Sequence, residues 1–361
     1  MKALIFLFLY ISCVVANASA SNEKWYEKIE VGGDFRYRHE YIDKEEQGGS
    51  NHRQRIRARL KTQGKVNDDV KIILQLATGN LEATSTNQSL DGTYNNKNFE
   101  LDMAYMEWSA YPSVNVLAGK VRNTFFSPGD SELIWDADLT PEGVAVNWKC
   151  KCDEKRKYFA NFATYWYEER DGESTTGGSD TIQYSIQAGS QFSISNSILD
   201  LGIGHHVFAP IEGHAVLGAT KGNSLDGSNQ YLNGYETSEA FLAWSPSQYT
   251  ITLYFHYLLN GAAGAEDTAY LAGFIYGKAK EEGDWSFDYN YRDTEADAVL
   301  GYLSDGDFAD GETNSRGHKI KIQYQLGESS TSSLMYLVSK RNVSTMPVDY
   351  NRGQLDFIFK F

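Results

Sequence analysis

Hydrophobic and polar residues alternate along most of this chain. The clearest stretches are 182–193, 249–257, 285–291 and 319–326, in which nearly every second residue is apolar or aromatic. Such alternation predicts β-strands with one apolar and one polar face. A soluble β-sandwich would show the same pattern with its apolar faces buried. Stripes of about nine residues with aromatics near their ends instead favour tilted strands that cross a bilayer.

Two kinds of break separate these stretches, and the two kinds alternate. Short breaks lie at 66–69, 111–113, 152–154, 195–197, 245–248, 281–283 and 327–329, and long ones at 43–51, 79–97, 123–142, 170–180, 209–234, 260–267, 293–316 and 342–352. Short turns at one end and long loops at the other are typical of bacterial membrane barrels. The pattern predicts an all-β fold, a closed antiparallel transmembrane β-barrel of about 16 strands with short periplasmic turns and long extracellular loops.

The start of the chain resembles a secretory signal. Lys2 precedes an apolar run over residues 3–15, and Ala18-Ser19-Ala20 offers small residues for cleavage. We therefore expect residues 1–20 to be a signal peptide and residues 21–361 to form one outer-membrane β-barrel domain. The alternatives are a first membrane helix and lipoprotein processing at Cys13.

The end of the chain reads as a strand with an apolar face. Leu355, Phe357, Phe359 and Phe361 occupy alternate positions, so they project from the same side. A terminal aromatic on such a strand resembles the recognition signal of outer-membrane barrels. That resemblance implies that Phe357, Phe359 and Phe361 are an assembly signal for the barrel-assembly machinery.

Composition agrees with a secreted barrel and narrows the partners. Tyr (24) and Gly (32) are abundant, Pro (6) and Cys (3) are scarce, and the formal net charge is −15. That charge argues against nucleic-acid binding, which needs a basic surface. An acidic surface is compatible with divalent ions bridging to outer-membrane lipid and lipopolysaccharide. Cys150 and Cys152 lack the four ligands of structural zinc, so we expect no metal and no cofactor.

Five cations follow one another at every second position. Arg53, Arg55, Arg57, Arg59 and Lys61 must share one strand face. A cation facing lipid at the bilayer midplane costs about 2–4 kcal/mol, so we expect this row to face the lumen. Further cations at Arg36, Arg38, Lys120 and Arg122 extend it to a pore-lining basic wall. The alternative is an ion-pair network that only fills the lumen.

An acidic segment follows the expected fifth strand. Residues 124–142 combine Phe and Trp with five carboxylates, Asp130, Glu132, Asp136, Asp138 and Glu142. It is the third long loop, and in general 16-stranded porins the third loop folds inward and narrows the pore. An acidic constriction loop facing a basic wall would create a transverse field across the pore. The alternative is an outer loop packed on the rim.

Residues 135–143, the arginine-rich second strand and Leu101-Asp102-Met103-Ala104-Tyr105 resemble the "putative porin" family of Gram-negative outer-membrane proteins. The resemblance implies a 16-stranded porin in the outer membrane of a Gram-negative bacterium. It further implies a homotrimer and passive diffusion of small hydrophilic solutes and ions through a water-filled channel. We expect anion preference or weak selectivity. The alternative is a non-conducting barrel that acts as a surface scaffold or adhesin through loops 209–234 and 293–316.

The sequence does not favour an enzyme. Gly129-Asp130-Ser131 resembles the nucleophile block of GDS-type esterases, but no His has an Asp three positions before it. There is also no G-x-S-x-G motif. His205 and His206 should point to opposite faces of a strand, so we expect no catalytic residues. The Asp-rich loop 293–312 reads as solvated rather than as a calcium site.

Overall fold

Sixteen long antiparallel strands form one closed sheet in the computed structural model, which describes residues 24–170, 179–216, 220–246 and 248–361. The strands are β1 (Ile29–Lys44), β2 (Gly49–Lys65), β3 (Val70–Thr78), β5 (Phe99–Tyr111), β6 (Val114–Lys120), β7 (Glu142–Lys151), β8 (Arg156–Glu168), β9 (Thr181–Ile194), β10 (Ser197–Ala209), β11 (Tyr235–Ser245), β12 (Ile251–Asn260), β13 (Thr268–Gly277), β14 (Trp285–Thr294), β15 (Ser315–Gly327), β16 (Ser330–Arg341) and β17 (Val348–Lys360). The expected signal peptide, residues 1–20, lies outside the described residues. The prediction of a barrel of about 16 strands is confirmed.

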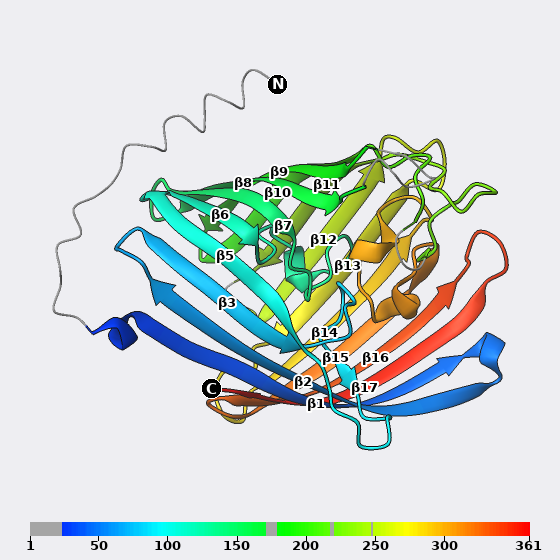
Figure 1. The fold of residues 1–361 in the computed structure, drawn as a ribbon, viewed down its shortest axis with the longest axis horizontal. Helices are drawn as coiled ribbons and strands as arrows, with labels where there is room; N and C mark the ends of the chain where they lie inside the picture. Colours follow the sequence, from blue (N-terminus) through cyan, green and yellow to red (C-terminus); the bar gives the residue numbers. More distant parts are fainter. Residues whose placement is uncertain (1–23, 171–178, 217–219, 247) are drawn as a thin grey trace.

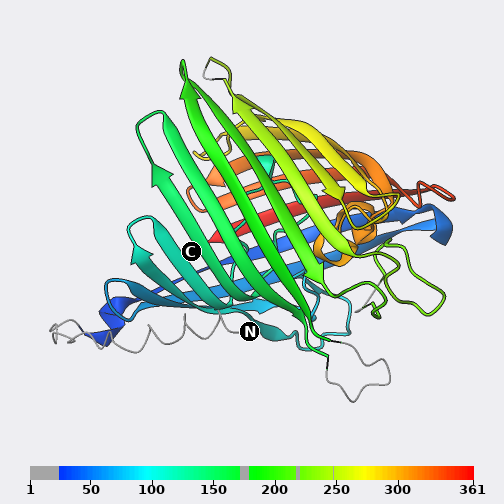
Figure 2. The same ribbon diagram turned by 90° about the horizontal axis from the view of Figure 1, so that it is seen from above.

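The sheet closes between its first and last strands. Each long strand pairs with the next along the chain, and β17 returns to pair with β1 (Figure 1). In the register of this seam Phe359 lies opposite Phe35. The backbones of Gly33 and Phe361 add two hydrogen bonds of 3.0 and 3.1 Å at this seam. Figure 2 shows the strands running diagonally across the barrel wall. No described helix has the length and apolarity needed to cross a membrane.

Connections alternate in length over most of the chain as the sequence predicts, but not everywhere. Residues 278–284 between β13 and β14, an expected short turn, form a connection as long as residues 261–267 between β12 and β13, an expected long loop. The turn between β1 and β2 contains only residues 45–48, formed by η3 (Glu45–Gln47) and a left-handed Gly48 with φ of 64°. The expectation of a long loop over 43–51 was therefore wrong. The backbones of the two strands pair as far as Lys44 opposite Gly49. Polar side chains do not by themselves end a strand, because the ladder is made by backbone hydrogen bonds.

Burial along the strands separates a lipid-facing surface from a lumen-facing surface. Phe35 and Tyr37 are 40% and 38% exposed, whereas Arg36 and Arg38, which alternate with them, are 8% and 5% exposed. The apolar and aromatic residues therefore cover the outside, and the polar residues line the inside, as membrane barrels require.

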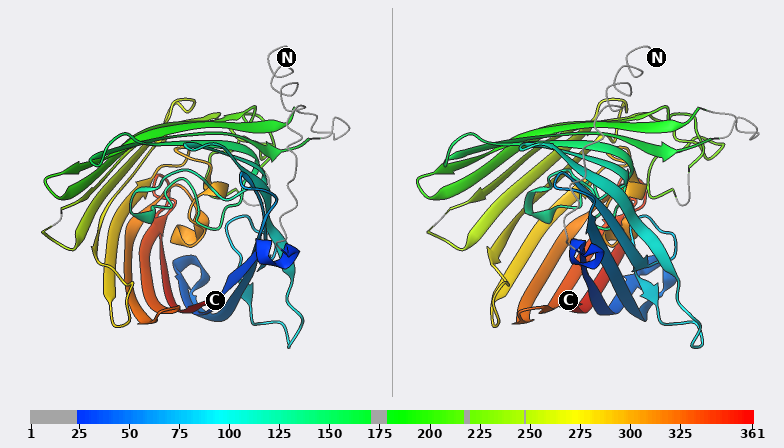
Figure 3. Two further views of the ribbon diagram at one scale, coloured as in Figure 1. Left: turned by 90° about the vertical axis from the view of Figure 1, so that its left-hand side faces the viewer. Right: turned by 60° about the vertical axis from the view of Figure 1, so that its left-hand side comes forward.

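Two loops fold into the barrel instead of extending away from it. Figure 3 shows residues 121–141, which contain η4 (Pro128–Asp130), and residues 295–314, which contain η5 (Gly301–Leu303) and η6 (Phe308–Gly311), inside the ring of strands. Leu133, Ile134 and Trp135 of the first loop share a buried apolar cluster with Val299 and Leu300 of the second. The same cluster includes inward residues of the wall, so burial of apolar surface holds both loops in the lumen.

The expectation that loop 293–312 is solvated was therefore wrong. Phe308 is 3% exposed, and Asp297 and Asp305 are 2% and 6% exposed. A third loop, residues 79–98, adds the two-residue strand β4 (Gln88–Ser89) to the edge of β2, where Ser89 pairs with Arg55. That pairing positions Thr86 and Asn87, both buried, next to the arginines of β2.

Candidate functional site

Four arginines on β1 and β2 lie side by side on the lumenal face. The strand register places Arg36 directly opposite Arg57 and Arg38 directly opposite Arg55. All four side chains are buried, and Arg53, Arg59 and Lys61 of the same row are half-buried. Like charges directly opposite each other destabilise a sheet, so this arrangement requires carboxylates from elsewhere in the fold.

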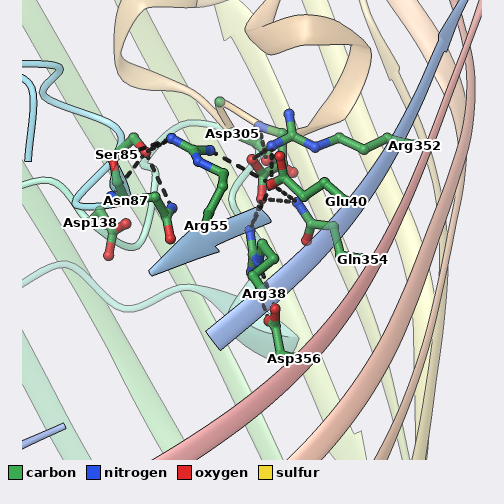
Figure 4. Close-up of polar contacts among 12 residues, drawn as sticks. Arg38, Glu40, Arg55, Ser85, Asn87, Asp138, Asp305, Arg352, Gln354 and Asp356 are labelled. Carbon is green, nitrogen blue, oxygen red and sulfur yellow. Dashed lines mark hydrogen bonds and ion pairs between the residues drawn. The ribbon is translucent and has the colours of Figure 1, made fainter. Parts of the chain in front are cut away.

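Glu40 supplies one centre of compensation on β1 itself. Its carboxylate is fully buried and accepts hydrogen bonds from Arg352 at 2.8 Å and from Gln354 at 3.2 Å (Figure 4). Arg53 also pairs with it, and Arg55 lies at 3.6 Å. Because Arg352 and Gln354 belong to β17, Glu40 joins the strands on both sides of the barrel seam.

Two further strand carboxylates pair with Arg38, Arg57 and Arg59. Asp34 accepts from Nε of Arg59 at 2.6 Å and lies 2.8 Å from Nη2 of Arg57. Asp356 accepts from Nε and Nη2 of Arg38 at 2.6 and 2.8 Å, a bidentate geometry that fixes the guanidinium plane.

The inward loops bring acidic side chains against this wall. Asp138 of loop 121–141 lies 3.8 Å from Arg57 and 3.7 Å from Arg59. Asp307 of loop 295–314 lies 3.2 Å from Arg38 and 2.7 Å from Arg352. Acidic groups from two loops, not from one, therefore face the basic side of the lumen.

The loops are also bonded to each other and to loop 79–98. Asp136 accepts a hydrogen bond of 2.9 Å from the backbone of Gly306, and its own backbone donates to Leu303 at 2.8 Å. Asp138 accepts from the backbone and the hydroxyl of Thr86, both at 3.3 Å. Three loops that are distant in sequence thus form one connected structure across the lumen.

A charged cavity of about 200 Å³ lies between the wall and these loops. Its lining includes five cations, Arg36, Arg38, Arg57, Lys319 and Lys321, and six acids, Glu132, Asp136, Asp138, Asp305, Asp307 and Asp356. Charges of both signs around a narrow space are suited to orienting polar solutes.

Burial changes the acidity of two loop carboxyls in this lining. It raises the pKa of Glu132 to about 7, and the nearby charge of Asp305 adds to the effect. The pKa of Asp136 is also raised well above its usual value, first by burial and then by Glu132. Asp307 behaves oppositely, because Arg352 and Arg38 outweigh burial and hold its pKa below its usual range.

Not every residue expected at the site lies in this cavity. Lys120 pairs with Glu142 at 3.0 Å. Strand alternation places both on the face of Ala118 and Val144, opposite the inward Leu117. Asp130 is exposed and does not line the cavity. Sequence spacing put these residues near the right elements but did not fix their direction.

Arg122 lies in a different part of the lumen. It is 3.9 Å from Glu107 and lines a second cavity of about 520 Å³ near the short-turn ends of β7 to β9. Lys149, Lys151 and Lys157 line that cavity as well. Arg122 therefore does not extend the row of arginines on β2.

Several cavity residues were missed from the sequence. Lys319 and Lys321 lie two positions apart on β15. This spacing already indicated a shared face, but two lysines form a weaker pattern than the row of five cations on β2. Asp305 and Asp307 sat in a loop read as solvated, and Asp305 binds Arg292 at 2.8 Å. No sequence pattern indicated that this loop turns inward.

A buried polar cluster attaches loop 121–141 to the opposite wall. Ser131 Oγ is 3.3 Å from Nδ1 of His256, whose Nε2 is 2.8 Å from Glu239. His206 lies 3.1 Å from the same carboxylate. The arrangement resembles a Ser-His-Glu triad, but Ser131 is 3% and His256 0% exposed, which leaves no room for a substrate. Its chemistry is that of an anchor.

Neither a metal centre nor a disulfide is found among the described residues. No group of three or more His, Cys, Asp or Glu side chains there has the arrangement needed to hold a metal ion. Cys150 and Cys152 are both free thiols.

Known proteins share this fold at low sequence identity. OprB of Pseudomonas putida is 10% identical with a TM-score of 0.59, covering 92% of this chain and 94% of that chain. A triple mutant of a porin from Rhodopseudomonas blastica is 12% identical with a TM-score of 0.53. The match covers 92% of this chain and 100% of that chain. OmpF of Salmonella typhi, in complex with daunomycin, is 9% identical with a TM-score of 0.55. The match covers 92% of this chain and 97% of that chain.

These likenesses establish the fold. No protein with a curated description matches the sequence significantly. The family described as "putative porin" matches residues 41–232 and 234–361, which is most of the chain. The chain therefore belongs to the putative porin family.

Proposed function

We propose that this protein is an outer-membrane porin whose water-filled channel lets small hydrophilic solutes and ions diffuse passively into a Gram-negative cell. The observation that best supports this is the charged cavity inside a closed barrel. Its lining includes Arg36 and Arg38 of β1 and Arg57 of β2, together with carboxylates of the two inward loops. A surface of this kind favours water and polar solutes over apolar ones.

The mechanism follows from the positions of the charges. Arg57 and Asp138, 3.8 Å apart, mark where the basic wall approaches the acidic loop. Solutes that pass beside them meet a field across the channel, which aligns their dipoles and replaces part of their hydration. We expect anion preference if the basic wall dominates, and weak selectivity if the acids of the same lining balance it. We infer a channel and not an enzyme.

The partners proposed from the sequence fit this role. Outer-membrane lipid and lipopolysaccharide would surround the apolar outer face, and the barrel-assembly machinery would insert the chain. We propose a homotrimer, as in general porins.

A second candidate function deserves a test because one observation favours it. Part of the lumen is filled by the apolar cluster that packs Trp135 and Leu300 against the wall. A barrel filled in this way would be a non-conducting scaffold or adhesin.

Planar-bilayer recordings with the purified protein distinguish the two functions. A porin gives discrete current steps in potassium chloride. In that case Ala137→Trp, which adds bulk at an exposed position lining the cavity, should reduce the step size. Ser228→Trp, at an exposed position in the loop between β10 and β11, is the matched control and should leave it unchanged. Insertion without current steps would instead support the scaffold.

A further inference from the structure

The cations that line the 200 Å³ cavity differ in how well they are compensated. Arg38, Arg57 and Lys319 each have a carboxylate oxygen within 3.3 Å. Arg36 has none that close, since its nearest carboxylate, Asp356, is 4.0 Å away. Lys321 has no carboxylate oxygen within 4.0 Å among the residues described.

Arg36 is held in place by a neutral partner. Its Nη2 donates a hydrogen bond of 2.6 Å to Oδ1 of Asn87, on loop 79–98. Its Nε is buried without a hydrogen-bond partner among the described residues, and the side chain as a whole is only 10% exposed. A buried guanidinium without an adjacent counterion is costly, and it cannot escape that cost by losing its proton.

Two acids in the same lining are also without a cation. Glu132 and Asp136 have no Lys or Arg nitrogen within 4.0 Å in the described part of the chain; their carboxylates accept backbone N–H groups of Ala137, Asp138 and Gly306. Unlike Arg36, a carboxylate can neutralise itself by binding a proton. Glu132 and Asp136 can therefore become neutral without a cation, whereas Arg36 stays positive. The missing counter-charge in the cavity is a negative one.

We propose that Arg36 and Lys321 form a binding site for a small oxyanion, a carboxylate or a phosphate, that passes through the channel. The inference rests on the proposed function, because it treats the ligand as a solute in transit. Arg36 on β1 and Lys321 on β15 approach the cavity from strands separated by β16 and β17. An oxyanion in the cavity would supply the adjacent counterion that Arg36 lacks and would make charge-assisted contacts with both cations.

Direct titration tests the site without requiring conduction. Inorganic phosphate is added to the detergent-solubilised protein at low salt, and the heat of binding is measured. The parent should bind phosphate, and Arg36→Gln and Lys321→Gln should each weaken the affinity about tenfold or more, the effect of losing one charge-assisted contact. Arg36→Lys should recover part of it. Acetate in a second titration shows whether the site takes a carboxylate as well as a phosphate.

Lys340→Gln is the matched control, because it removes one positive charge from an exposed pair with Asp349 outside the cavity. It should leave the phosphate affinity unchanged. Absence of phosphate and acetate binding by the parent would overturn the site, as would equal affinities of the parent and Arg36→Gln. Current steps in potassium chloride without oxyanion binding would reject the site and keep the porin function. Binding without current steps would reject the porin function instead.

Discussion

Asp136 and Gly306 are joined by a hydrogen bond of 2.9 Å from the backbone N–H of Gly306 to the Asp136 carboxylate. These residues belong to loops 121–141 and 295–314, which enter the lumen from different strands. The bond therefore helps to fix the positions of the two acidic loops relative to each other. A channel of this kind is shaped by the contact between its loops as well as by its strands.

Replacing Asp136 with Ala should loosen this contact. The Gly306 N–H would lose its acceptor, at a cost of about 1–3 kcal/mol for a buried donor. We expect larger and noisier current steps in bilayer recordings and a lower unfolding temperature in detergent. Asp136→Asn is the control, since its amide oxygen still accepts the bond. If Asp136→Ala keeps the parental step size, this contact does not set the width of the channel.

Most of the barrel was accessible from the sequence because its signals are local. Period-two alternation depends on neighbouring residues of one strand, and turn lengths depend on where the alternation stops. The arginines of β2 were assigned to the lumen by the cost of facing lipid. Lys120 was added to the basic wall without an alternating run of cations to fix its direction, and it lies on the face of Ala118, opposite the inward Leu117.

The inward path of loop 295–314 could not be predicted from such local signals. Its direction depends on burying Leu300 and Phe308 and on pairing Asp305 with Arg292 and Asp307 with Arg352. Arg352 lies on β17, far along the chain, and Arg292 lies on β14 just before the loop, but no periodicity relates either arginine to its acidic partner. Asp-rich composition alone predicted solvation, whereas tertiary ion pairs determined the outcome.

Selectivity should depend on pH through Glu132. With its pKa raised to about 7, this carboxyl is neutral at pH 5 and ionised at pH 9. The reversal potential in a salt gradient should therefore shift toward cations as the pH rises, and Glu132→Gln should flatten that shift. Asp307, whose pKa is lowered, stays ionised throughout and contributes no change. An identical pH dependence in the Glu132→Gln variant would contradict this assignment.

The stability of the folded protein should also depend on pH through Glu132, and the direction of the change follows from the raised pKa of its carboxyl. The folded protein holds the Glu132 proton more tightly than the unfolded chain does, because the folded pKa of about 7 lies above the usual 4.5. The stabilisation is complete below pH 4.5 and is lost as the pH rises through 7. Unfolding temperatures in detergent should fall across this interval, and by less in Glu132→Gln.

Removing the Glu40 carboxylate should destabilise the barrel seam. Arg53, Arg55 and Arg352 would lose a fully buried shared partner, and breaking a buried ion pair costs about 3–5 kcal/mol. Glu40→Gln keeps the shape but removes the charge, so it should lower the unfolding temperature clearly. Glu142→Gln, which affects an exposed pair with Lys120, is the control. Equal unfolding temperatures for the two variants would show that the Glu40 network adds little.

Deleting Phe361 should impair assembly. Its backbone exchanges two hydrogen bonds with Gly33 where β17 meets β1, and its exposed ring continues the outer row of Phe357 and Phe359. We expect less folded protein in the outer-membrane fraction, measured by heat-modifiable migration on gels. Phe361→Trp keeps a terminal aromatic and should assemble. Normal yields of the truncated chain would reject these three residues as the assembly signal.

Replacing Arg55 and Arg57 together with Gln tests the basic wall itself. Both side chains are buried on the lumenal face, and Arg57 lines the cavity beside Asp138. Local charge should dominate over the net charge of −15, because screening limits distant charges to about 8–10 Å at physiological salt. The reversal potential should therefore shift toward cations, and more strongly at low salt. Arg156→Gln, at an exposed turn, should have no such effect. If the double variant keeps the parental reversal potential while still folding, the arginine row fills the lumen as an ion-pair network and does not control what passes through it.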